Sequence, residues 1–167
     1  METDSTQGSP LYVRSKPRRY KVANADEIIE AARLVAGQRM QRGASFVNPA
    51  ESQRFFTDKL GGLEREVFAA VFLDTRHRLI EYAELFKGTI DGAEVHPREV
   101  VRQALRCNAA AVLVAHNHPS GTVEPSAADR AVTARLKQAL ALVDVRLLDH
   151  VVVGGTETAS MAARGLV

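Results

Sequence analysis

An apolar run that ends in two histidines constrains the fold of this chain more than any other segment. The run covers residues 109–115, is short and partly β-branched, and meets a polar loop, so it predicts a buried strand. His116 and His118 follow at its carboxyl end. Because side chains alternate across a strand, both imidazoles point to one side and Asn117 points elsewhere. The pair can therefore reach a single metal ion.

A third metal ligand has to come from another element, and Asp129 is the candidate. It lies in the first turn of a helix that we expect from about residue 126 to residue 142. Two neutral imidazoles and one carboxylate suit a divalent ion of the zinc type, with water in the fourth position. A closed structural zinc site would be expected to use cysteine as well, and Cys107 is the only cysteine.

The same residues also fit roles that need no metal. Ser126 and Asp129 have the spacing of a capping box, in which the serine hydroxyl accepts from the aspartate N–H and the carboxylate reaches back. The His-x-His pair can equally be a polar strand end. Between them, Pro119, Gly121 and Pro125 form a turn-rich bridge that would fold the helix start back over the strand end. The pattern leaves these alternatives open.

Other metal chemistries need motifs that the chain lacks. A nucleobase deaminase carries His-x-Glu followed by Pro-Cys-x-x-Cys, and a zincin carries His-Glu-x-x-His on a helix. Neither pattern occurs. A His/His/carboxylate set can also hold ferrous iron in an oxygenase, but that triad gives no reason for the alternating helices and strands of this sequence. Iron is the weaker alternative.

Four short motifs follow one another along the chain: EVHPREV at 94–100, AHNHPSG at 115–121, PSxxD at 125–129 and DHVVVG at 149–154. In this order they resemble the RadC family, which belongs to the JAMM (MPN-type) metalloprotease-like domains. The resemblance covers about Asn48 to the C-terminus. It implies a zinc ion bound by His116, His118 and Asp129, with water as the fourth ligand, and a layered MPN architecture of the cytidine deaminase-like type.

The resemblance also implies residues for amide hydrolysis. In JAMM hydrolases a glutamate at the start of the first core strand is the general base and acid, and Glu66 is the matching residue, with Glu64 as the fallback. Ser126 corresponds to the JAMM serine that donates a hydrogen bond to the developing oxyanion. The implied enzyme is a zinc metallopeptidase or isopeptidase-like hydrolase with a peptide or protein substrate. The alternative is a non-catalytic, metal-containing MPN module linked to DNA repair, recombination or mobile-element DNA.

Composition agrees with one globular domain and an N-terminal appendage. The 167 residues are 46% hydrophobic and can bury one core. A single cysteine fits a reducing cytosol, which predicts a cytoplasmic protein. No apolar run approaches membrane-spanning length, so no membrane partner is expected. The net charge of +2 is too small to decide on partners.

We predict three segments: a flexible basic tail at residues 1–23, a helical segment at 24–44 and the RadC-like JAMM/MPN domain at 45–167. The basic residues of the tail would allow contact with nucleic acid or an acidic partner; they are Arg14, Lys16, Arg18, Arg19 and Lys21. Longer RadC-family members carry an N-terminal helix-hairpin-helix region. The residues before the core are too few for one plus the tail, which makes this chain similar to the shorter members.

The expected fold class is α/β (α+β mixed), with a mixed β-sheet sandwiched by helices. Strands are predicted at 67–73, 79–86, 109–116 and 145–153, and helices at 24–42, 49–60, 97–108 and 126–142. Two more histidines are not assigned as ligands. His96 is expected at a helix start, and His150 either contacts a metal ligand or is a satisfied core histidine.

Overall fold

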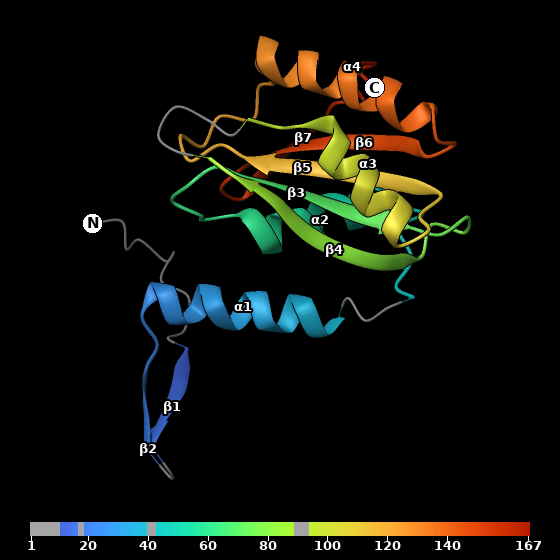
Figure 1. Cartoon of the computed structure of the whole chain (residues 1–167). Helices are drawn as coiled ribbons and strands as arrows, with labels where there is room; N and C mark the ends of the chain where they lie inside the picture. Colours follow the sequence, from blue (N-terminus) through green and yellow to red (C-terminus); the bar gives the residue numbers. More distant parts are fainter. Residues whose placement is uncertain (1–10, 17–18, 40–42, 89–93) are drawn as a thin grey trace.

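The computed structural model describes residues 11–16, 19–39, 43–88 and 94–167 (Figure 1). No helix in these ranges is long and apolar enough to cross a membrane. The elements are, in order, β1 (Tyr12–Lys16), β2 (Arg19–Val22), α1 (Ala25–Arg39), α2 (Pro49–Leu60), β3 (Val67–Leu73), β4 (Leu79–Lys87), α3 (Pro97–Arg106), β5 (Ala111–Asn117), α4 (Ala127–Ala141), β6 (Arg146–Gly154) and β7 (Glu157–Ser160).

Five of these strands form one mixed sheet in the order β4-β3-β5-β6-β7. β3 pairs antiparallel with β4 and with β5, whereas β5 and β6 run parallel. Parallel neighbours need a crossover connection, and α4 supplies it (Figure 1). The carboxyl end of β5 and the first turn of α4 are therefore joined by one short loop, residues 118–126.

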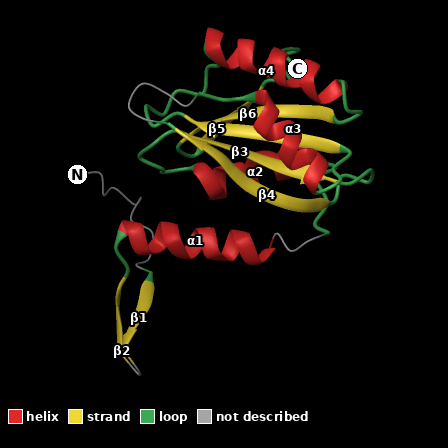
Figure 2. Cartoon of the chain, viewed as in Figure 1, coloured by secondary structure: helices red, strands yellow, loops and turns green. Residues whose placement is uncertain are grey.

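The strands supply two hydrophobic cores, one on each face of the sheet, because their side chains alternate. One face packs against α2 and takes from β3 the side chains of Val67, Ala69, Val71 and Leu73. The other face packs against α3 and α4 and takes Phe68, Ala70 and Phe72. Figure 2 shows α2 on one side of the sheet and α3 on the other. The predicted fold class, a mixed sheet between helices, is confirmed.

The N-terminal segment differs from its prediction. No strand was predicted within residues 1–23, yet β1 and β2 pair antiparallel there, and the side chains of β2 are exposed. α1 begins where predicted, with a capping box: Asn24 Oδ1 accepts from the Glu27 N–H at 2.8 Å, and the Glu27 carboxylate accepts from the Asn24 N–H at 3.1 Å. Residues 1–10, 17–18 and 40–42 lie outside the described ranges. The predicted boundaries at 23 and 44 stay predictions.

Most elements of the core agree with their predicted ranges. α2 begins at Pro49, where the Asn48 side chain accepts from the Ala50 N–H at 3.0 Å, and β3 covers the expected residues. β5, α4 and β6 differ from prediction by one or two residues at their ends. β7 was missed because it has four residues and follows β6 after a tight Gly155 turn (φ 66°).

Candidate metal centre and cleft

The two histidines lie at the carboxyl end of β5 on the face that α3 and α4 cover. His116 is the penultimate residue of the strand and is 1% exposed, and His118 follows the strand and is half-buried. The His118 N–H donates to the Val153 carbonyl at 2.8 Å, which keeps the chain in strand-like register beyond the end of β5. As predicted, the intervening Asn117 side chain lies on the opposite side.

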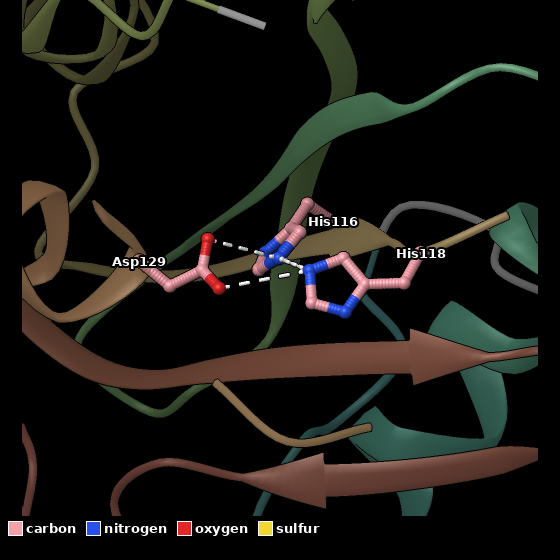
Figure 3. Close-up of side chains that lie close together, drawn as sticks. All are labelled: His116, His118 and Asp129. Atoms are coloured by element: carbon pink, nitrogen blue, oxygen red, sulfur yellow. Dashed lines mark hydrogen bonds and ion pairs between the residues drawn. The ribbon is translucent and has the colours of Figure 1, made fainter. Parts of the chain in front are cut away.

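Asp129 both caps α4 and faces the histidines. Its Oδ2 atom accepts from the Ser126 N–H at 2.7 Å, while the Ser126 hydroxyl accepts from the Asp129 N–H at 3.1 Å. Its Oδ1 atom lies 3.2 Å from His116 Nε2, and Oδ2 lies 3.6 Å from His118 Nε2 (Figure 3). The two roles left open by the sequence are therefore compatible in one side chain.

Hydrogen bonds fix which nitrogen of His118 is free. Its Nδ1 atom lies 2.8 Å from the carbonyl oxygen of Thr122. A carbonyl oxygen only accepts, so Nδ1 carries the proton and Nε2 of the neutral ring presents a lone pair. That Nε2 atom lies 2.9 Å from Nε2 of His116. The lone pair of His118 thus points at the space shared with His116 and the Asp129 carboxylate.

The donor set fits a metal ion. One ligand atom from each of His116, His118 and Asp129 lies within 4.8 Å of the others. Two ring nitrogens and a carboxylate oxygen lie around one space, and a cation there would interact favourably with all three. Two imidazoles and one carboxylate are the protein ligands of a common type of catalytic zinc site, which leaves a fourth position open. These three residues can bind a metal ion.

The surroundings keep the carboxylate charged and the histidine behind it neutral. Burial raises the pKa of Asp129, but the hydrogen bond and charge of His116 and the hydrogen bonds from Ser126 outweigh burial and hold that pKa below its usual range. Burial, and after it the charge of His116, lowers the pKa of His150 to about 3. At neutral pH the site therefore combines an ionised Asp129 with an uncharged His150.

The three residues open onto a cleft of about 620 Å³, which also contains the two predicted catalytic residues. Glu66 is half-buried and lines this cleft from the start of β3. Ser126 is exposed and lines it from the start of α4. The hydroxyl of Ser126 accepts the capping hydrogen bond, so its own proton remains available for donation. Apolar side chains complete the wall: Phe68, Val95 and Val132.

Glu64, the fallback general base, faces another part of the surface. It is exposed and lines a separate hollow with residues of α1, among them Glu30 and Arg33. The structure therefore brings Glu66, and not Glu64, to the cleft of the histidines. His96 is not among the described residues that line this cleft. It is the N-cap residue of α3, as predicted, and its ring packs edge-on against the ring of Phe86, with 6.0 Å between the ring centroids.

Asn117 connects the metal centre to the backbone on both sides of Glu66. Its Oδ1 atom accepts from the Val67 N–H at 2.8 Å, and its Nδ2 group donates to the carbonyls of Arg65 and Leu63 at 3.0 and 3.3 Å. The side chain is buried, at 2% exposure. One residue between the two histidines therefore fixes the segment that carries Glu66. Sequence alternation placed Asn117 on the far side but could not reveal these partners.

Two buried polar residues lie behind the histidines, and the sequence singled out only His150, as a residue that contacts a metal ligand or is satisfied in the core. His150 is fully buried, and its Nε2 atom lies 2.7 Å from Nδ1 of His116. Thr133, which the sequence did not single out, lies 2.6 Å from Nδ1 of His150. The spacing offers one signal for it, because Thr133 is one turn after Asp129 and shares the buried face of α4 with Leu136 and Leu140.

A family model for the RadC-like JAB domain matches residues 46–166 of this fold and spans the whole centre. The chain belongs to the RadC-like JAB domain family. The resemblance drawn from the four motifs is thereby confirmed, and so is the fold that it implied. Membership fixes the JAMM-type fold but does not by itself assign an activity to a RadC-like domain.

Bacterial relatives cover most of the chain and carry the name UPF0758 protein. The relative from Marinobacter nauticus is 56% identical over 147 residues, which are 88% of this chain and 66% of that protein. The relative from Xanthomonas campestris pv. campestris is 60% identical over 77% of this chain and 57% of that protein. The relative from Vibrio cholerae is 54% identical over 83% of this chain and 87% of that protein. The chain thus spans about two thirds or less of the first two relatives.

Proposed function

We propose that this RadC-like JAB domain is a zinc-dependent hydrolase that cleaves peptide or isopeptide-like amide bonds. The observation that carries the proposal is the presence of Glu66 and Ser126 in one cleft with the convergent donors His116, His118 and Asp129. A site that only binds metal for folding needs ligands, but it needs neither a carboxylate base nor a free hydroxyl beside them.

Each residue has one task in this proposal. His116, His118 and Asp129 hold the zinc ion, which supplies Lewis acidity that lowers the pKa of a water molecule toward about 7 and polarises an amide carbonyl. Glu66 accepts the proton of the attacking water and delivers it to the leaving nitrogen. The Ser126 hydroxyl donates a hydrogen bond to the oxygen on which negative charge develops.

Hydrolysis in H₂¹⁸O tests the proposal without a known substrate. The zinc-loaded chain is incubated with a mixture of casein peptides, and mass spectrometry counts new C-termini that carry ¹⁸O. We expect the wild-type chain to create them and Glu66→Gln to retain zinc while losing turnover by about 10²–10⁴-fold. Glu64→Gln is the matched control and should retain both. Elemental analysis of Asp129→Ala should show a loss of zinc.

Three outcomes would contradict the proposal. Zinc content that is unchanged in Asp129→Ala would reduce Asp129 to a helix cap. Full turnover by Glu66→Gln would remove Glu66 as the general base. A zinc-loaded wild-type chain that creates no labelled C-termini would favour the non-catalytic module. Contact of the basic N-terminal segment with nucleic acid and a cytoplasmic location stay predictions of the sequence.

A further inference from the structure

A buried chain of hydrogen bonds runs from His116 into the helix that carries Asp129. Nδ1 of His116 lies 2.7 Å from Nε2 of His150, and Nδ1 of His150 lies 2.6 Å from the Thr133 hydroxyl. The hydroxyl lies 2.6 Å from the backbone carbonyl oxygen of Asp129. His150 and Thr133 are 0% exposed and His116 is 1% exposed, so bulk water does not substitute for any of these partners.

The last acceptor determines which atom donates in each of these hydrogen bonds. The carbonyl oxygen of Asp129 only accepts, so the single proton of the Thr133 hydroxyl is donated to it. The Met161 sulfur is a weaker and more distant acceptor, at 3.6 Å. The hydroxyl must then accept from Nδ1 of His150, which leaves Nε2 of that neutral ring as an acceptor. Nδ1 of His116 is therefore a donor, and its Nε2 atom presents a lone pair.

The reverse direction would disable the centre. If Thr133 donated to His150, the ring would carry its proton on Nε2 and would donate to Nδ1 of His116. The proton of His116 would then lie on Nε2, where it occupies the lone pair that a metal requires. Both directions use the same heavy-atom positions in the two rings. They differ in whether the Asp129 carbonyl receives a hydrogen bond from the Thr133 side chain.

We propose that Thr133 and His150 are positioning residues that hold His116 in the tautomer with Nδ1 protonated and Nε2 free for metal. The inference rests on the metal centre of the proposed function. Asp129 lies at both ends of the arrangement: its carboxylate faces Nε2 of His116, and its carbonyl oxygen orients the hydrogen bonds behind that ring. Hydrogen bonds to the second nitrogen of a ligating histidine also fix the orientation of the ring.

Removal of the Thr133 hydroxyl tests the inference. Thr133→Val keeps the shape of the side chain but neither accepts from His150 nor donates to the Asp129 carbonyl. We expect its zinc affinity, measured by competition with a chromophoric chelator, to fall about 10–100-fold. Thr133→Ser retains the hydroxyl and should bind zinc close to the wild-type level. In the zinc-loaded wild-type protein, ¹⁵N chemical shifts of His116 should show a protonated Nδ1 and a metal-bound Nε2.

A matched control separates positioning from stability. Leu140 lies on the same helix, is fully buried and has an apolar side chain that can form no hydrogen bond, so Leu140→Ala should destabilise the protein without a change in zinc affinity. Wild-type zinc affinity in Thr133→Val would overturn the inference, and so would an equal loss in Leu140→Ala. The proposed function fails separately if the wild-type chain binds zinc but hydrolyses no amide, whereas a wild-type chain that binds no zinc would overturn both.

Discussion

The amide of Asn117 should contribute strongly to stability because water cannot replace one of its hydrogen bonds, the one to the buried Val67 N–H. In Asn117→Ala, the Val67 N–H loses its acceptor at a residue that is 5% exposed, while the Arg65 carbonyl belongs to an exposed residue and can turn to water. An unsatisfied buried donor costs about 1–3 kcal/mol, and each lost hydrogen bond that water replaces costs about 1 kcal/mol or less. The expected loss is therefore about 3 kcal/mol in the free energy of unfolding.

Guanidinium denaturation of the metal-free protein measures this loss, because bound metal would add its own binding free energy to stability. For a chain of this length, about 3 kcal/mol corresponds to a decrease in Tm of roughly 6–12 °C. Asn48→Ala is the matched control: it removes one exposed amide that caps α2, at a cost of about 1 kcal/mol. At a temperature where both variants are folded, only Asn117→Ala should also reduce turnover, because it frees the backbone beside Glu66.

A loss in Asn117→Ala no larger than in Asn48→Ala would refute this reasoning. It would mean that the Val67 N–H finds another acceptor or that the start of β3 does not depend on Asn117. If Asn117→Ala lost the expected free energy of unfolding but kept its turnover, the two effects would be separate, and Glu66 would be positioned by its own strand alone.

Three further predictions concern the loop, the buried histidine and the cysteine. Gly154→Ala would place a Cβ atom in steric conflict with the Gly121 carbonyl oxygen, so the loop after His118 must move and zinc affinity should fall. Gly155→Ala is the control: its Cβ meets no atom within 4 Å, so it should alter stability alone, through the φ of 66° at that position. The pKa of His150 is lowered from 6.5 to about 3, so between these pH values the unfolded chain binds a proton that the folded chain does not. The stability of the metal-free protein should therefore fall as pH decreases from 6.5 to about 3. Denaturation at each pH should show that this contribution to the pH dependence disappears in His150→Gln. Burial raises the pKa of Cys107, so iodoacetamide should alkylate this thiol more slowly than free cysteine at pH 7.5, and Cys107→Ser should keep zinc and turnover.

The sequence predicts the core of the fold because its elements have strong local signals. Pro49 begins a helix with a fixed φ, and the uninterrupted apolar run of β3 suits a strand that is buried on both faces. The strands that were not predicted have weak local signals in the sequence. β7 has only four residues, and the basic side chains of β1 and β2 resemble those of a solvated tail. The order of the strands in the sheet was not predicted either, since a single sequence contains little information about which distant strands pair.

The candidate metal centre was likewise predictable only in part. Alternation along β5 and the motif order were enough to select His116, His118 and Asp129, which the structure brings within 4.8 Å of one another. His150 was expected to contact a metal ligand or to be satisfied in the core, but Thr133 was not predictable, because a buried threonine on a helix gives no sign of its partner. Thr133 and His150 are 17 residues apart and meet only when α4 packs against β6.

The alternation of His116, Asn117 and His118 at the end of β5 has a consequence for how the chain can change in evolution. Three successive residues act on opposite faces of one strand, two toward the metal centre and one toward the segment that carries Glu66. A single-residue insertion or deletion within β5 would exchange these faces, so the centre and the anchor of the base would be lost together. The register of β5 against β3 and β6 is therefore fixed by two requirements at once.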